Sequence, residues 1–95
     1  MGSFVTHLEG SIDGSFHEHR RLQTTHEGRP LLVRYDLAAV AQAVRRADLA
    51  RRPADLWRYR ELLPVEADEN VVSLGEGTTP LLECPRLARE LGLEQ

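Results

Sequence analysis

Proline placement limits how long any helix in the second half of this chain can be. Proline interrupts the interior of a helix but is tolerated in its first turn. The apolar spacing of Leu37, Val40 and Val44 matches one helical face, and Asp36 stands where a helix cap belongs. The pattern therefore predicts a helix over 37–51, which Pro53 closes.

Two shorter helices are expected after this one. An amphipathic piece over 56–63 follows Asp55 and ends before Pro64. Pro85 suits the first turn of a last helix over 86–91, and Gly92 suits the position just after it. Cys84 directly precedes this helix and is expected to be a buried cap residue. Between these helices, the acidic stretch 66–70 is expected to be an exposed loop.

The first 35 residues favour strands and turns. Residues 4–8 alternate weakly between two faces, and residues 31–35 have the strongest strand pattern in the chain. The polar stretch 11–28 between them contains the turn formers Asp13-Gly14 and Glu27-Gly28. It is expected to be a hairpin or small ribbon with almost no core.

These elements predict an α/β fold, or α+β for the piece taken alone, with a short β-ribbon followed by two to three helices and short strands. The expected units are a small ribbon over 1–35 and a helical and strand portion over 36–95. The core is expected to be thin, because 95 residues bury little surface and only 5% of them are aromatic.

Charge and composition exclude several classes of function. All twelve basic residues are arginine, so no side-chain amine is present for lysine catalysis. The net charge of −3 disfavours a nucleic-acid binder. A single cysteine allows no internal disulfide, and no apolar run is long enough to span a membrane. The chain is therefore expected to be cytoplasmic, with no nucleic-acid or membrane partner.

Four histidines stand within the first 26 residues, at positions 7, 17, 19 and 26. His17 and His19 form an H-x-H pair, which on a strand would project both rings from one face, as some zinc and copper sites do. Four exposed polar side chains, His7, His17, His19 and His26, explain the same pattern without a metal.

The loop Gly75-Glu76-Gly77-Thr78-Thr79 is the most informative motif. Two glycines free its backbone, and two hydroxyls stand beside its amides, so such a loop can receive an anion. It lacks the lysine of a phosphate-binding P-loop, and Glu76 would repel a neighbouring phosphate. The spacing alone favours a simple turn between two strands, 71–74 and 81–82.

Three blocks of the sequence resemble the N-terminal region of threonine synthase, in the same order and at the expected separations. The blocks are GRPLLVRYDL at 28–37, LWRYRELLP at 56–64 and VVSLGEGTTPLL at 71–82, followed by LARELGL at 87–93. Together they cover nearly the whole chain.

The resemblance implies a pyridoxal-phosphate enzyme of fold type II, similar to the tryptophan synthase β subunit. Its reaction converts O-phosphohomoserine and water into threonine and phosphate. In that family a lysine of a later Ser-Phe-Lys segment holds the cofactor. Because these 95 residues contain no lysine, the chain is expected to bind no cofactor and to be inactive alone, as a piece that stops before that segment.

Many members of the family begin with a ribbon whose cysteine pairs hold zinc. The corresponding positions here are Gly10, Asp13, Thr25 and Glu27, and none of them carries a thiolate. The ribbon is therefore interpreted as metal-free.

By the same resemblance, Gly75, Glu76, Gly77, Thr78 and Thr79 lie near the mouth of the active-site cleft and form the candidate substrate-pocket neighbourhood. The alternative is that they only turn the chain toward the cofactor domain. The expected partner is the remainder of the enzyme, or a protein that covers exposed apolar side chains, namely Trp57, Leu62, Leu63, Val71 and Leu74. A stand-alone module that binds a metal or a protein remains the alternative function.

Overall fold

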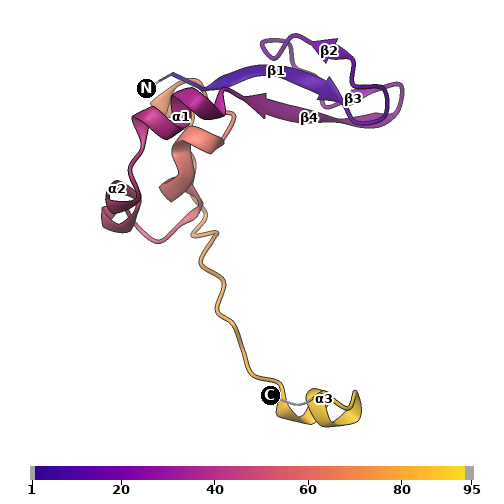
Figure 1. The fold of residues 1–95 in the computed structure, drawn as a ribbon, viewed down its shortest axis with the longest axis vertical. Coiled ribbons are helices and arrows are strands. Elements are labelled where there is room, and N and C mark those ends of the chain that lie inside the picture. Colours follow the sequence, from indigo (N-terminus) through magenta and orange to yellow (C-terminus); the bar gives the residue numbers. More distant parts are fainter. Residues whose placement is uncertain (1, 94–95) are drawn as a thin grey trace.

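The computed structural model describes residues 2–93 and contains a small antiparallel sheet followed by short helices (Figure 1). Residues 1, 94 and 95, at the ends of the two expected units, lie outside the described residues. The sheet has the strand order β2-β1-β4-β3. Its strands are β1 (Val5–Gly10), β2 (Phe16–His17), β3 (Thr25–His26) and β4 (Arg29–Tyr35). The expected ribbon is confirmed, and the chain is a mixed α/β piece.

The long central strands β1 and β4 form most of the sheet. Leu8 pairs with Val33 and Gly10 pairs with Leu31, and an irregularity between Val5 and His7 shifts the register. Leu8 is 8% exposed, and it is the one hydrophobic side chain that is buried among residues 2–93. The two edge strands have only two residues each, so the sheet offers little surface for a core.

The helix expected over 37–51 is two helices, α1 (Leu37–Ala43) and α2 (Arg46–Arg51). Asp36 caps α1 as expected, since its Oδ1 accepts the Ala39 N–H at 2.9 Å. The single helix was wrong because Val44 and Arg45 are extended, with φ of −125° and −104°. The Asp48 carboxylate accepts the Arg45 N–H at 3.2 Å, which begins a new helix at this point.

The next two elements are tight 3-10 turns. The amphipathic piece forms η1 (Leu56–Leu62), which is kinked at Tyr59. The expected acidic loop contains η2 (Asp68–Asn70). Pro64 follows the end of η1, as the sequence predicts.

The strands expected at 71–74 and 81–82 do not form, so the simple turn between two strands was wrong. A strand needs a neighbouring strand to satisfy its backbone groups, and Figure 1 shows the later part of this segment leading away from the sheet. Leu81 and Leu82 are 102% and 75% exposed.

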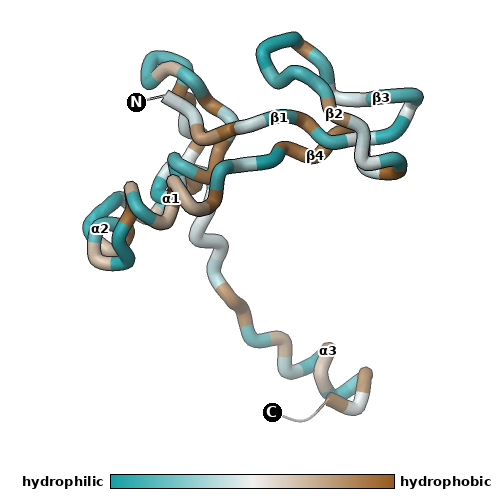
Figure 2. The backbone as a smooth tube through the Cα atoms, turned by 45° about the horizontal axis from the view of Figure 1, so that its top comes forward, coloured by the Kyte–Doolittle hydropathy of each residue, from teal (hydrophilic) through white to brown (hydrophobic). Residues whose placement is uncertain are grey.

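The segment leads to α3 (Pro85–Glu90), which has Pro85 in its first turn and Gly92 left-handed after it, as expected. Figure 2 shows this last helix at the far end of the chain from the sheet. Cys84 precedes α3 but is exposed, because nothing in the described chain packs over this helix. The buried cap was therefore wrong.

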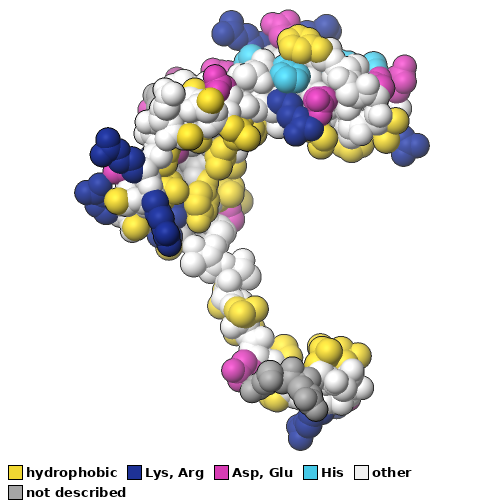
Figure 3. Space-filling model, viewed as in Figure 1, with side chains coloured by type: hydrophobic (Ala, Val, Ile, Leu, Met, Phe, Trp, Pro, Cys, Tyr) yellow, Lys and Arg dark blue, Asp and Glu magenta, His cyan; other side chains and the backbone are white. Residues whose placement is uncertain are grey.

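Apolar side chains gather on the inner side of the helical part, facing the departing segment (Figure 3). Of the five apolar residues expected to be exposed, Leu62 and Leu74 are, at 42% and 91%. Trp57, Leu63 and Val71 are half-buried instead. No helix within residues 2–93 has the length and apolar character needed to cross a membrane.

Candidate functional site

The candidate loop, Gly75–Thr79, packs against the beginning of η1. The Leu56 N–H donates to the Glu76 carbonyl at 3.0 Å. The Thr78 hydroxyl donates to the Ala54 carbonyl at 2.8 Å. These two bonds join residues 20 and 24 positions apart in the sequence, so the loop is held in one position on the chain.

Trp57 extends this attachment to the segment before the loop. Its indole N–H donates to the Val72 carbonyl at 2.9 Å. The half-buried indole thereby satisfies its polar atom. Residues 72–78 are thus hydrogen-bonded to residues 54–57 at three points.

Both glycines of the loop have a left-handed backbone conformation, but only Gly77 also lies against η1. Gly75, Gly77 and Thr78 all have positive φ, of 78°, 94° and 52°. A Cβ on Gly77 would lie 2.7 Å from the Leu56 nitrogen, whereas a Cβ on Gly75 would meet open space. Gly77 therefore permits the close approach of the loop to η1.

The Glu76 carboxylate turns back onto the loop's own backbone. Its Oε2 accepts the Leu74 N–H at 2.5 Å, and the Ser73 hydroxyl accepts the Gly75 N–H at 3.3 Å. The carboxylate thus has a structural partner and places a negative charge within the loop. A phosphate beside it would be repelled.

An ion pair joins η1 to Arg52, the residue that follows α2. Arg52 binds Glu61 through two bonds of 2.7 Å, and the Glu61 side chain is only 4% exposed. The hydrogen bond from Arg52 holds the pKa of the Glu61 carboxyl below its usual range. Arg58 braces the same turn by donating to the carbonyls of Pro53 and Arg52, at 3.1 and 3.0 Å.

Arg60 makes a second buried attachment at the end of η1. Its guanidinium donates to the Val65 carbonyl at 2.6 Å and to the Asp68 carboxylate at 3.3 Å. Arg60 and Glu61 are among the most buried side chains described. Sequence reasoning missed this polar support, although Arg58, Arg60 and Glu61 all stand in the second resembling block.

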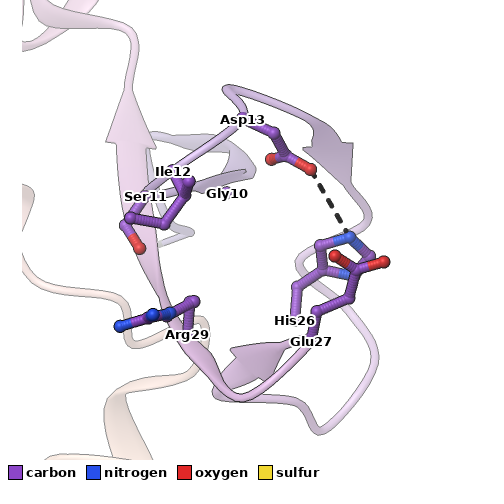
Figure 4. A pocket seen from close by; sticks show the side chains of 7 residues that line it. All are labelled: Gly10, Ser11, Ile12, Asp13, His26, Glu27 and Arg29. Atoms are coloured by element: carbon purple, nitrogen blue, oxygen red, sulfur yellow. Dashed lines mark ion pairs between the residues drawn. The ribbon is translucent and has the colours of Figure 1, made fainter.

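Two pockets lie away from the loop. One, of about 160 Å³, is an apolar groove between the helices, lined by Val40, Ala41, Val44, Leu49, Tyr59, Glu61 and Leu62. The other, of about 170 Å³, lies in the ribbon, lined by Gly10, Ser11, Ile12, Asp13, His26, Glu27 and Arg29. Figure 4 shows Asp13 and His26 facing each other across this ribbon pocket, 3.6 Å apart.

The ribbon pocket contains three of the four positions that correspond to zinc cysteines, Gly10, Asp13 and Glu27. The fold thus brings these positions together, but their side chains form no ligand set. Among residues 2–93 no three His, Cys, Asp or Glu side chains are grouped so that they could hold a metal ion.

Two of the four histidines contact each other, and the other two have partners elsewhere. His7 stacks on Phe16 at 4.9 Å between ring centres, and His17 lies 4.4 Å from His26. His19 points to Glu66, with Nε2 and Oε1 3.5 Å apart. The H-x-H pair therefore does not converge on one point.

Comparison with known proteins gives curated relatives, among them the following two. One is "Threonine synthase" of Methanocaldococcus jannaschii, 40% identical over 68 residues, which are 72% of this chain and 17% of that protein. The resemblance to threonine synthase is confirmed. The other is "Threonine synthase" of Methanosarcina acetivorans, 45% identical over 40 residues, which are 42% of this chain and 9% of that protein.

The chain thus spans less than a fifth of the threonine synthases that it matches. No family model matches it. No solved structure matches it significantly either. The similarity to threonine synthase therefore concerns a segment, and the catalytic properties of the whole enzyme are a separate question.

Proposed function

We propose that this chain is the N-terminal part of a threonine synthase and is inactive by itself. In the whole enzyme, O-phosphohomoserine and water give threonine and phosphate with pyridoxal phosphate as cofactor. The 40% identity over 68 residues supports this proposal. A cytoplasmic location belongs to the same proposal, since the single Cys84 allows no internal disulfide.

The docked candidate loop is the single structural observation on which the role of this chain rests. Its hydrogen bonds to Ala54 and Leu56 fix the loop before any substrate arrives. A loop fixed in advance loses little conformational entropy when a ligand binds. We assign Gly75, Glu76, Gly77, Thr78 and Thr79 to the wall of the substrate pocket, where Gly77 and Thr78 set the position of the loop.

The residues of this chain do not fit pyridoxal phosphate. There is no lysine to form an imine with the cofactor, and the loop carries the Glu76 carboxylate beside its amides. The groups that hold the cofactor must therefore come from another part of the enzyme. No catalytic step is assigned to this chain.

The partner in this proposal is the remainder of the same enzyme. The apolar groove and the leucines of the last segment are the surfaces it would cover. Leu74, Leu81 and Leu82 are more than two-thirds exposed, and burial of such side chains contributes roughly 1.5–3 kcal/mol each.

A chimera tests the proposal directly. The 68-residue matching segment of the M. jannaschii enzyme is replaced by the corresponding residues of this chain, and phosphate release from O-phosphohomoserine is measured. We expect the chimera to keep activity within about tenfold of the parent enzyme. The 95-residue chain alone should release no phosphate and, after dialysis with pyridoxal phosphate, should retain no imine absorption.

Two results would contradict the proposal. One is a chimera that folds and binds the cofactor but releases no phosphate. The other is phosphate release by the 95-residue chain alone. The matched control is the M. jannaschii enzyme in which the loop that corresponds to residues 75–79 of this chain has a scrambled sequence. This control should bind the cofactor while losing substrate affinity.

A further inference from the structure

Four polar side chains connect opposite edges of the sheet. In the strand order β2-β1-β4-β3, the strands β2 and β3 lie at the two edges. Yet His17 of β2 and His26 of β3 are 4.4 Å apart between ring centres. The sheet is therefore curled so far that its edges meet through side chains.

The bonds between these groups have one consistent proton arrangement. Ser15 Oγ lies 2.6 Å from Asp13 Oδ1 and 2.7 Å from His17 Nε2. A carboxylate only accepts, so the serine hydroxyl donates to Asp13 and accepts from the His17 Nε2–H. Asp13 then has its other oxygen, Oδ2, 3.6 Å from His26 Nε2.

The backbone makes room for this cluster. A Cβ on Gly10 would lie 2.2 Å from Asp13 Oδ1 and 2.6 Å from Ser15 Oγ. The Ser15 backbone N–H also donates to Asp13 Oδ1, at 3.0 Å. Donation by the Ser15 hydroxyl keeps the pKa of Asp13 below its usual range, so this carboxylate stays charged near neutral pH.

We propose that Asp13, Ser15, His17 and His26 form a one-proton latch that closes the curled sheet and opens in acid. One proton on His26 strengthens its contact with Asp13, and His17 can donate to Ser15 while neutral. A second proton, on His17, places two imidazolium rings side by side, 4.4 Å apart between centres. The Asp13 carboxylate contacts His26 and reaches His17 only through Ser15. Glu27 and Arg29, which line the same pocket, carry opposite charges.

The latch is tested by nuclear Overhauser contacts between the His17 and His26 rings in the full 95-residue chain. We expect a strong contact at pH 7 that falls at least threefold at pH 5, because two positively charged rings this close repel each other. Cross-strand contacts between Leu8 and Val33 should persist at both pH values, which shows that the sheet itself stays folded.

His17→Gln separates the latch from a general effect of acid. Its amide keeps a donor for Ser15 but removes the second imidazolium, so the contact between side chain 17 and His26 should persist at pH 5. His7→Gln is the control, since His7 stacks on Phe16 outside the latch, and this variant should open like the unchanged protein. Asp13→Asn should open at higher pH, because it removes the negative charge that faces His26.

Three outcomes would overturn the latch. One is equal contact between the His17 and His26 rings at both pH values in the unchanged protein. The second is loss of the contact at pH 5 in the His17→Gln variant. The third is loss of that contact at both pH values in the same variant while the Leu8 and Val33 contacts remain.

Discussion

Arg52 and Glu61 face each other in a two-pronged ion pair, with Nη1 to Oε2 and Nη2 to Oε1 both at 2.7 Å. This pair joins the residue that follows α2 to the buried Glu61 of η1. Arg52 also donates to the Arg58 carbonyl at 2.8 Å, so one guanidinium binds both the Glu61 carboxylate and the backbone of η1. The candidate loop rests on a turn that is supported by charge more than by apolar packing.

Glu61→Gln should destabilise the chain by about 3 kcal/mol, because it leaves the half-buried Arg52 guanidinium without its anion. Urea unfolding followed by Trp57 fluorescence measures the change. Arg51→Gln is the matched control, since the Arg51–Asp48 pair is exposed and should contribute less than about 1 kcal/mol. An equal decrease in the free energy of unfolding in both variants would show that the Arg52–Glu61 pair stabilises the chain no more than an exposed pair does.

The stability of the chain should fall in acid, because the Glu61 carboxyl then takes up a proton and loses its charge. The pKa of Glu61 is lowered in the folded state by the hydrogen bond from Arg52, from an ordinary value of 4.5. Its contribution is therefore complete above pH 4.5 and is lost as pH falls through the lower folded value. Comparing the urea midpoints of the unchanged chain and Glu61→Gln from pH 7 to pH 3 tests this. The difference between them should shrink in acid, and a constant difference would argue against the link.

Gly77→Ala should release the candidate loop from η1. The new Cβ would press on the Leu56 nitrogen in a backbone conformation with φ of 94°, at a cost of about 2 kcal/mol or more. Gly75→Ala is the control, because its Cβ meets open space and only the left-handed conformation costs about 1 kcal/mol. Amide chemical shifts of residues 54–57 report the release, and they should move in the Gly77 variant alone.

Thr78→Val should weaken the same attachment without changing the shape of the side chain. It removes the hydroxyl that donates to the Ala54 carbonyl, which corresponds to about 1 kcal/mol. Hydrogen exchange at the Leu56 amide, which bonds to Glu76, should become faster. Thr79→Val provides the comparison, and a similar acceleration there would mean that the Thr78 bond does not hold the loop.

Elements with local signals could be predicted from the sequence. Asp36 caps α1, and Pro85 and Gly92 bound α3, because such signals act within a few residues. The break at Val44 could not be predicted, since its apolar stripe continues through it and Asp48 forms a competing start. The strands expected at 71–74 and 81–82 do not form. A strand pattern in the sequence does not show whether a second strand lies beside it to accept its hydrogen bonds.

The candidate site was located by motif, but its geometry depends on distant partners. The docking of Gly77 on Leu56 and the meeting of His17 with His26 join positions that no local spacing relates. Arg52 and Glu61 are likewise nine residues apart across a turn whose path the sequence does not specify. Residue types suggested candidate groups for chemistry, whereas the fold decides which of these groups meet.

The separation of α3 from the sheet has a practical consequence in solution. The Cα radius of gyration is 18.1 Å, whereas a compact chain of 95 residues has about 12 Å. Such a body encounters more friction than a sphere of its 10.7 kDa mass. A single chain should therefore elute early from a gel-filtration column and resemble a larger particle, so light scattering is the measurement that distinguishes one chain from two.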